Sequence, residues 1–292
     1  MSAGGALLVD KPAGPTSHDV VAVVRRALGR GARVGHAGTL DPFATGLLVV
    51  LWGRSTRLAP YLSGLDKRYR VVAQLGVRSD TGDRDGLLTP VEGARIPDRS
   101  QLAGLAATFE GEIEQVPPTT SAIHIGGRRA HELHRAGETV VMPVRKVSVY
   151  AFTLEELEEE RSRATLTVHC SKGTYVRALV RDLGELAGCG AYCDELRREA
   201  SGPLEVAHAA SLGAVENNPT GGLWALTPAA AVMHLPAREL DPSEQTAVRH
   251  GRSIASQGEL GPTRCLADGR LLCIAEPVDG ALDPKVVLEP NA

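Results

Sequence analysis

One acidic side chain in this sequence stands in a setting suited to chemistry. Asp41 directly precedes a proline, which pushes the backbone of Asp41 toward extended conformations. Glycines at positions 35, 38 and 46 surround it, so the segment is predicted to be an irregular loop. Such a loop can present a carboxylate to a ligand as a nucleophile or as a base. An Asp-Pro pair that only begins a turn has the same local pattern, and the local sequence leaves both interpretations open.

Planar side chains supply further candidates. His36 adds a polar ring in the same loop, although loop histidines are often simply solvated. Tyr69 and Tyr175 offer aromatic faces to a ligand, and each fits an apolar core equally well. Arg177 carries a guanidinium that can bind a carboxylate through two parallel hydrogen bonds, or it lies exposed on a helix. Residue type alone therefore names candidates without deciding among them.

Short strands and a helix must position the Asp41 loop. Leu7–Val9 and Leu47–Leu51 are apolar runs that predict strands. Between them, Thr16 or Ser17 can cap a helix that ends near Gly29. This helix is predicted to carry Val20, Val21, Val24 and Leu28 on one face. The loop is therefore expected to connect this helix to the second strand.

The middle of the chain alternates between strand and helix patterns. A strand is predicted over 69–77 and another over 165–170, from the alternation of apolar and polar residues. One face of the first strand comprises Tyr69, Val71, Ala73, Leu75 and Val77. Helices are predicted over 100–109, 130–136 and 175–186. In the last of these, Tyr175, Leu179, Leu183 and Leu186 follow helical spacing and so share one apolar face. Strands mixed with scattered helices, without regular βαβ alternation, favour an α+β catalytic domain with a mixed or antiparallel sheet and flanking helices.

The end of the chain predicts a second, smaller domain. Asp241-Pro-Ser-Glu244 combines a helix N-cap, a proline at the first helical position and a glutamate that reaches back to the cap. Asp268-Gly269, between two apolar runs, is a β-hairpin signal. We therefore predict a catalytic domain over residues 1–230 and a small, mostly β domain over residues 231–292.

The cysteines and the apolar runs exclude several classes of protein. The five cysteines are odd in number and contain no Cys-x-x-Cys pair, which argues against a disulfide framework and a zinc ribbon. They are expected to be core thiols. The longest apolar run, Leu47–Trp52, is shorter than the ~20 residues that cross a bilayer, and the N-terminus lacks the basic stretch of a secretory signal. We expect a cytoplasmic protein.

The net charge of −3 conceals an asymmetry along the chain. Residues 1–80 carry eleven lysines and arginines against five acids, and 11 − 5 gives +6. A basic N-terminal surface permits a phosphate-bearing partner. Acidic residues gather elsewhere, notably over 155–160, where we expect a solvated turn or helix end.

Several motifs follow one another in a fixed order. GHAGTLDPFATGLL surrounds Asp41, and it lies between Lys11-Pro-Ala-Gly-Pro-Thr-Ser17 and Asp66-Lys-Arg-Tyr69. Ser79-Asp-Thr-Gly-Asp83, Gly173-Thr-Tyr-Val-Arg177 and Glu195-Leu-Arg-Arg198 come later. These motifs closely resemble those of the TruB-type pseudouridine synthases. The resemblance extends over residues 5–205, and the C-terminal region resembles the PUA-type RNA-binding domain of that family.

The resemblance implies an isomerase that converts uridine 55, in the T-arm of tRNA, into pseudouridine. It implies that Asp41 is the catalytic aspartate, and that Tyr69 and Arg177 are the active-site tyrosine and arginine. The implied substrate contacts are Lys11, His36, Tyr69, Asp80, Tyr175 and Leu196. Arg177 would keep a buried Asp41 ionised. The chemistry is redox-neutral, so no metal and no organic cofactor is expected.

The segment 115–142 resembles the RNA-gripping insertion of the tRNA-specific branch, and it favours that branch over the guide-RNA-dependent one. One departure stands out, because Thr119-Thr120 occupy a place where an aromatic residue is common in the family. The implied partner is tRNA. We expect a monomer that needs no protein partner.

The sequence lacks the motifs of two rival enzyme classes and leaves one non-catalytic alternative open. A uracil methyltransferase would need a nucleophilic cysteine, and a base deaminase would need His-x-Glu with Pro-Cys-x-x-Cys, and neither pattern occurs. A non-catalytic RNA-binding or RNA-folding protein could keep the same fold. The sequence also leaves open whether Asp41 attacks the base at C6, attacks the ribose at C1′ or acts as a base.

Overall fold

The computed structural model describes residues 4–29, 31–121, 123–125, 127–130, 133, 138 and 141–289. The chain forms two compact units. Unit 1 comprises residues 1–42, 46–64 and 201–292, and unit 2 comprises residues 43–45 and 65–200. The predicted helix over 130–136 falls mostly outside the described residues. The predicted division at residue 230 follows a different criterion, the change in sequence pattern, and it stays a prediction.

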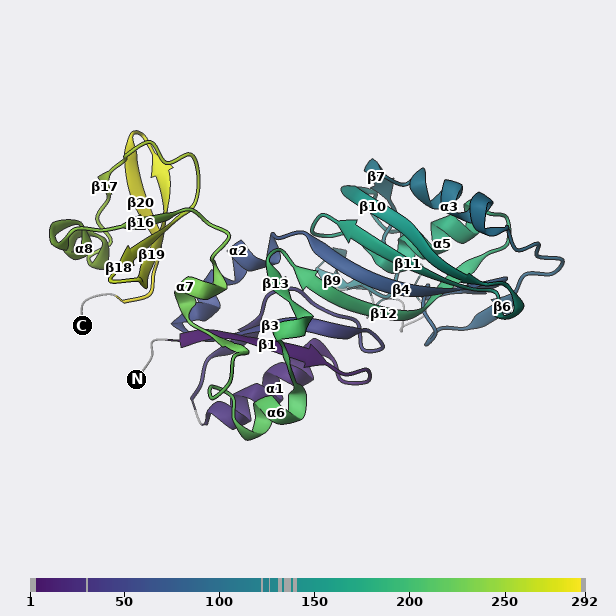
Figure 1. The fold of residues 1–292 in the computed structure, drawn as a ribbon, viewed down its shortest axis with the longest axis horizontal. Coiled ribbons are helices and arrows are strands. Elements are labelled where there is room, and N and C mark those ends of the chain that lie inside the picture. Colours follow the sequence, from purple (N-terminus) through teal and green to yellow (C-terminus); the bar gives the residue numbers. More distant parts are fainter. Residues whose placement is uncertain are drawn as a thin grey trace. The chain divides into compact units, whose positions relative to one another are not determined.

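The N-terminal part of unit 1 is built on strand β1, Gly4–Lys11 (Figure 1). It pairs antiparallel with β3, Thr45–Gly53, and with β15, Ala225–Leu226, and parallel with β14, Ala210–Ser211. Strand β2, Val34–His36, extends this sheet beyond β3. Both parallel and antiparallel pairs therefore occur, as a mixed sheet requires.

Helix α1, Ser17–Leu28, covers this sheet with α6, Leu212–Asn217, beside it (Figure 1). Thr16 caps α1 in a capping box with Asp19, as the sequence predicts. Val20, Val21 and Val24 are buried, whereas Leu28, predicted on the same face, is only partly buried. The remaining short elements are η1 (Arg54–Leu58), α2 (Ala59–Ser63), β13 (Leu204–Glu205), η3 (Val206–His208) and α7 (Pro228–Ala231).

The C-terminal part of unit 1 is a five-stranded sheet with one helix, α8. Its strand order is β16-β18-β19-β20-β17. The Asp268-Gly269 hairpin is confirmed, because both residues have positive φ, 50° and 73°, as a type I′ turn requires. The bounds are β16 Ala237–Glu239, α8 Pro242–Arg249, β17 Ile254–Ala255, β18 Thr263–Ala267, β19 Arg270–Val278 and β20 Ala281–Val287.

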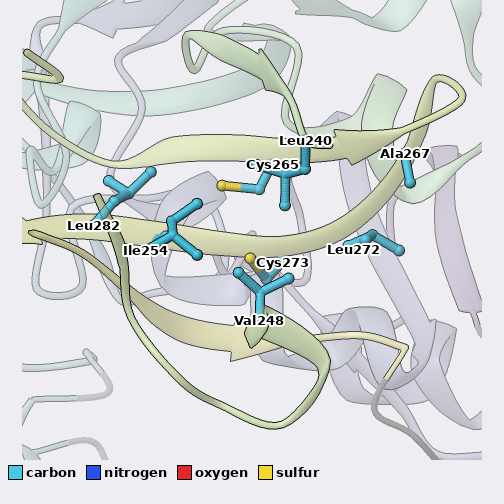
Figure 2. Close-up of a cluster of buried hydrophobic side chains, with 9 residues drawn as sticks. Leu240, Val248, Ile254, Cys265, Ala267, Leu272, Cys273 and Leu282 are labelled. Atoms are coloured by element: carbon cyan, nitrogen blue, oxygen red, sulfur yellow. The ribbon is translucent and has the colours of Figure 1, made fainter. Parts of the chain in front are cut away.

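A separate apolar core fills this small sheet. Figure 2 shows Cys265 and Cys273 among aliphatic side chains that include Val248 of α8. The capping box of α8 is present, with Asp241 at the N-cap and Glu244 reaching back. The predicted small, mostly β domain is therefore confirmed as a structural element.

Unit 2 contains the strands in the order β12-β4-β11-β10-β7. Neighbouring strands run antiparallel where β4, β11, β10 and β7 pair. Helices α3 and α5 pack against β10 and β4, respectively, and touch each other (Figure 1). The bounds are β4 Lys67–Leu75, α3 Arg99–Ala107, β7 Gly111–Gln115, β10 Arg145–Glu158, β11 Arg163–Cys170, α5 Val176–Leu186 and β12 Ala191–Ser201.

Three sequence predictions in unit 2 need correction. The strand predicted over 69–77 ends at Leu75, because Gly76 has a φ of +83° and turns the chain into a separate strand, β5 (Val77–Ser79), which pairs with β6 (Leu88–Pro90). Leu186, predicted on the apolar face of α5, is 55% exposed. The acidic run 155–160 is not a turn throughout. Its first four residues end β10, and only then does the short helix η2 (Glu159–Arg161) begin.

The hairpin of β8 (His124–Ile125) and β9 (Arg128–Arg129) completes the described elements of unit 2. No helix in the described ranges combines the length and hydropathy needed to span a membrane. The predicted α+β class, with a mixed sheet and flanking helices, is confirmed.

Candidate active site

The backbone before Asp41 is anchored by a buried hydroxyl. Ser17, at the start of α1, is 1% exposed. Its Oγ accepts a hydrogen bond from the Leu40 amide at 2.9 Å and donates to the Leu40 carbonyl at 3.1 Å. One side chain thus holds both backbone groups of the residue preceding Asp41. The geometry of the loop depends on a helix that begins 24 residues earlier.

The backbone after Asp41 is anchored by a buried cation. Lys11, at the end of β1, is fully buried, and its Nζ donates to the Pro42 carbonyl at 3.0 Å and to the Pro12 carbonyl at 2.8 Å. The Gly14 amide donates to the same Pro42 carbonyl at 2.9 Å. Lys11 therefore positions the loop, and the substrate contact predicted for it stays a prediction. The motif Lys11–Ser17 therefore forms hydrogen bonds to the Asp41 loop on both sides of Asp41.

His36 closes strand β2 in the same unit and pairs with Val50 of β3. Its ring is half-buried and lies edge-on to that of His18, with centroids 5.4 Å apart and planes at 87°. Gly38, with a φ of +107°, turns the chain between His36 and Asp41. In unit 1, Lys11 thus bonds to the Asp41 loop, and His36 ends the strand that precedes the loop.

We expect Ser17→Ala to slow catalysis about tenfold or more while the protein stays folded. The variant removes both hydrogen bonds to Leu40, and a displacement of about 1 Å at a catalytic group can lower a rate about a hundredfold. The free energy of unfolding should fall by about 1–3 kcal/mol. The single-turnover rate of the reaction that the motif resemblance implies, and urea unfolding, measure the two effects. Ser55→Ala is the matched control, because Ser55 is equally buried but lies on η1, outside this network. An equal loss of rate in both variants would contradict the anchoring role.

Unit 2 places Arg177 at the centre of a buried polar cluster. Arg177 lies in the first turn of α5 and is 2% exposed. Its Nη1 donates to Asp83 Oδ2 at 2.8 Å, to the Thr81 carbonyl at 2.9 Å and to Thr120 Oγ1 at 2.8 Å. Its Nη2 donates to the Thr120 carbonyl at 3.1 Å. Burial on this scale excludes the alternative of an arginine exposed on its helix.

Asp83 is the functional candidate that residue-level reasoning missed. Asp83 is 6% exposed, and its carboxylate also accepts hydrogen bonds from Thr81 Oγ1 at 2.7 Å and from the Asp85 amide at 3.1 Å. Asp80, predicted as a substrate contact, is exposed and accepts from the Leu87 amide at 2.8 Å. The signal was present, because both aspartates belong to one motif and only the first was singled out.

The departure at Thr119-Thr120 also has a structural counterpart. Thr120 supplies both its hydroxyl and its carbonyl to the guanidinium of Arg177. This position of the insertion therefore helps to fix the arginine. Thr120, which departs from the family pattern, therefore has a defined polar role in this chain.

The two tyrosines lie in different settings within unit 2. Tyr175 is partly exposed, and buried Gln115 holds it by donating to its carbonyl at 3.1 Å and accepting from its amide at 2.8 Å. The guanidinium carbon of Arg145 lies 5.8 Å from the centroid of the Tyr175 ring. Tyr69 is 9% exposed on β4, opposite Val168 of β11. Tyr175 thus has the more accessible ring.

Leu196, on β12, is 7% exposed, and its carbonyl accepts a hydrogen bond from Thr45 Oγ1 at 3.4 Å. The five candidates in unit 2 are Tyr69, Asp80, Tyr175, Arg177 and Leu196. Asp41 belongs to unit 1. The pairing of Arg177 with Asp41 stays a prediction.

A second buried cation lies two residues before Tyr69. Lys67 is 6% exposed, opposite Cys170 across the β4–β11 pair. Burial, reinforced by the positive charges of Arg198 and Lys172, lowers the pKa of Lys67 to about 8. Burial raises the pKa of the Cys170 thiol to about 11. The region beside Tyr69 therefore disfavours charge of either sign.

The lowered pKa of Lys67 predicts a stability that rises with pH. Folded Lys67 loses its proton near pH 8, and unfolded lysine loses it near pH 10.5. Between these values the unfolded state binds more protons, so raising the pH favours the folded state by up to about 3 kcal/mol. Urea unfolding of the wild type and of Lys67→Met at several pH values measures this difference. A difference between the two proteins that does not change with pH would contradict the prediction.

All five cysteines are buried free thiols, as expected for core residues. In the part of the chain that the structure describes, no three His, Cys, Asp or Glu side chains are grouped so that they could hold a metal. The expectation that no cofactor is required rests on the reaction chemistry and stays a prediction.

Comparison with protein-family models places most of the chain. Residues 25–176 match the TruB family pseudouridylate synthase N-terminal domain. Residues 177–220 match the tRNA pseudouridylate synthase B C-terminal domain. The first match ends and the second begins at the start of α5, so Arg177 falls at the junction of the two.

Curated relatives align along almost the whole chain. The tRNA pseudouridine synthase B of Synechococcus sp. (strain CC9311) is 41% identical over 294 residues, covering 98% of this chain and 97% of that protein. The tRNA pseudouridine synthase B of Thermobifida fusca (strain YX) is 42% identical over 292 residues, covering 98% of each. Both alignments include the Asp41 loop and the C-terminal sheet.

Solved structures share the fold. A chain from the crystal structure of a Cbf5-Nop10-Gar1 complex superposes with a TM-score of 0.76 at 25% identity, covering 98% of this chain and 85% of that one. A chain from an H/ACA RNP bound to a substrate RNA containing 2′-deoxyuridine gives 0.75 at 24% identity, with the same coverage. With the family models and the full-length relatives, these similarities lead to one assignment. The chain belongs to the TruB family of pseudouridylate synthases and is an isomerase.

Proposed function

We propose that this enzyme converts uridine 55, in the T-arm of tRNA, into pseudouridine in the cytoplasm. The observation that carries the proposal is the anchored Asp41 loop, in which Ser17 and Lys11 fix the residues on either side of the carboxylate. A catalytic group must be held in a defined position, and this loop is held from both ends. The full-length similarity to tRNA pseudouridine synthases B supports tRNA as the substrate.

The proposed reaction moves the uracil from a nitrogen to a carbon linkage. The bond between N1 of the base and C1′ of the ribose breaks, the base turns, and a bond forms between C5 and C1′. The proton on C5 leaves, and N1 gains a proton, so the reaction is redox-neutral. Asp41 acts as the nucleophile or the base in this sequence of steps. The target nucleotide is flipped out of its stack so that the carboxylate can reach it.

The other candidate residues bind and orient the extruded nucleotide. The half-exposed ring of Tyr175, fixed by Gln115, offers a stacking surface that replaces the stacking lost on flipping. Leu196 and Tyr69 form apolar walls, and His36 and Asp80 contact the RNA. Lys11, which is fully buried, acts by holding the Pro42 carbonyl next to Asp41. Arg177 keeps Asp41 ionised and oriented. The C-terminal domain, residues 231–292, adds RNA contacts as a PUA-type module.

The proposal favours tRNA over a guide-RNA mechanism. The solved neighbours include Cbf5 complexes, but their identity to this chain is 24–25%, whereas the curated tRNA pseudouridine synthases B reach 41–42%. The insertion over 115–142 also supports the tRNA branch. The proposed enzyme acts as a monomer on tRNA alone, without a protein partner or a guide RNA.

The test uses the purified chain and an unmodified tRNA transcript labelled with tritium at C5 of its uridines. Release of one tritium per tRNA, followed by mapping of the modified position in the T-arm, is the expected result. The control reaction contains every component except the protein. Absence of release with tRNA alone, and its appearance only after a guide RNA is added, would contradict the proposal.

A further inference from the structure

A cavity of about 430 Å³ lies in unit 1, outside the set of candidate catalytic residues. The end of α1, the chain leading into β2, the end of β3 and the start of η1 form its walls. The Gly53 amide donates to the Arg33 carbonyl at 2.8 Å, and Val34 pairs with Trp52, so these walls are joined by sheet hydrogen bonds. The lining residues are Leu28, Gly31, Ala32, Arg33, Trp52, Gly53 and Arg54. We call it the Trp52 cavity.

The Trp52 cavity is remote from the Asp41 loop. Gly46 of β3 pairs with Lys11, whose ammonium holds Pro42, and Trp52 lies six residues further along the same strand. At about 3.3 Å per residue, six residues span roughly 20 Å. A uridine bound at Asp41 therefore cannot also occupy the Trp52 cavity.

The lining combines an indole with two guanidinium groups. Arg33 and Arg54 are exposed, and Trp52 is partly buried. One Nη of Arg54 donates to the Leu288 carbonyl at 3.0 Å, which holds that side chain at the edge of the cavity. Residues 20–65 contain six arginines and a single acid, Asp41. The residues that line the cavity include two arginines and no acid, although the whole chain carries −3.

Aromatic rings beside guanidinium groups form the usual surface on which proteins bind nucleotides of single strands. The base stacks on the ring, which contributes about 1–3 kcal/mol, and the arginines meet the phosphate. We propose that the Trp52 cavity binds a nucleotide of the RNA substrate other than the target uridine. The choice of RNA as the source of this nucleotide rests on the proposed function. A free mononucleotide has the same chemistry and is the competing ligand.

Arg33→Ala tests the proposal without disturbing the walls, because the backbone of Arg33, and not its side chain, bonds to Gly53. The dissociation constant for unmodified tRNA should rise about tenfold, and the dependence of log affinity on log salt should weaken by about one. The single-turnover rate at saturating enzyme should stay within twofold of wild type, because the cavity does not touch the target. Arg161→Ala is the matched control, since its side chain is 71% exposed on η2 of unit 2. It should bind tRNA within twofold of wild type.

Tryptophan fluorescence gives a direct readout of stacking. The chain has two tryptophans, so Trp224→Phe leaves Trp52 as the only one. Addition of tRNA should quench its fluorescence, and Arg33→Ala in the same background should shift that quenching to about tenfold higher tRNA concentration. An unchanged fluorescence at saturating tRNA would overturn the stacking contact.

Two further outcomes would overturn the proposal. One is tRNA affinity of Arg33→Ala within twofold of wild type. The other is that uridine monophosphate quenches Trp52 in the wild type but not in Arg33→Ala, while the two proteins bind tRNA equally well. That result would show that the cavity binds a free nucleotide. Failure of the proposed function is distinguishable, because a wild type that binds tRNA without forming pseudouridine leaves the affinity comparison intact.

Discussion

Replacing Asp41 with asparagine is expected to abolish pseudouridine formation and to leave tRNA binding within a few-fold of wild type. The amide keeps the size of the carboxylate, and the hydrogen bonds from Ser17 to the Leu40 backbone and from Lys11 to the Pro42 carbonyl hold the loop. The loop should therefore keep its shape. The negative charge that a nucleophile or a base requires is lost, so we expect a fall in rate of at least about a thousandfold.

Tritium release under single-turnover conditions and equilibrium binding of tRNA measure the two effects separately. Binding should survive because it draws on many phosphate contacts, whereas the chemistry draws on one side chain. Asp279→Asn, in an exposed turn where asparagine tolerates the positive φ of 50°, is the control for the loss of one carboxylate. Product formation in Asp41→Asn within a few-fold of wild type would remove Asp41 from the mechanism. An RNA-folding protein without catalysis would show no product even in the wild type.

The Asp41 loop was predictable because its signals are local. Glycines, a proline and a helix cap lie close together in the sequence, and the structure keeps each of them in its expected place. The contacts that hold the loop were not predictable in the same way. Ser17 bonds to Leu40 and Lys11 to Pro42 across more than twenty residues, and no local pattern encodes such pairs.

The partners of Arg177 were also not predictable from local sequence patterns, because they lie even further away in the sequence. Asp83 lies 94 positions from Arg177 in the sequence, and Thr120 lies 57 positions away. Motif matching placed Arg177 and the loop of Asp83 in the site, but it could not say which carboxylate meets the guanidinium. Only tertiary structure brings three segments of unit 2 to one buried cation.

The long strand β10 shows why some elements escaped prediction. Val147, Val149, Phe152 and Leu154 are buried, but the step from Val149 to Phe152 breaks the alternation, because the register with β11 shifts there. A second shift follows between Leu154 and Glu156. The acidic residues at the end of β10 have the composition of a solvated turn. Sheet pairing overrides that local preference, because the backbone of this segment still completes the ladder with β11.

Arg177→Lys should lower the rate of pseudouridine formation about a hundredfold, although the positive charge is kept. The guanidinium of Arg177 serves four acceptors through two nitrogens, and lysine offers a single nitrogen on a differently shaped side chain. Asp83 and Thr120 would then hold buried acceptors without adequate partners. Breaking such a buried pair costs about 3 kcal/mol or more, so the free energy of unfolding should fall as well.

Two companion variants separate a structural role from a role in positioning Asp41. Arg181→Lys is the matched control, because Arg181 lies one turn further along α5, its side chain is 32% exposed, and it donates to the Val116 carbonyl. Its rate should stay within about threefold of wild type. Asp83→Asn removes the charge opposite Arg177 but leaves the guanidinium in place. If Arg177 acts only by supporting the cluster, Arg177→Lys and Asp83→Asn should lose rate and stability in the same proportion. If Arg177 also orients Asp41, Arg177→Lys should lose more rate than Asp83→Asn for the same loss of stability. Near-normal turnover of Arg177→Lys would show that Arg177 is not the partner of the Asp41 carboxylate.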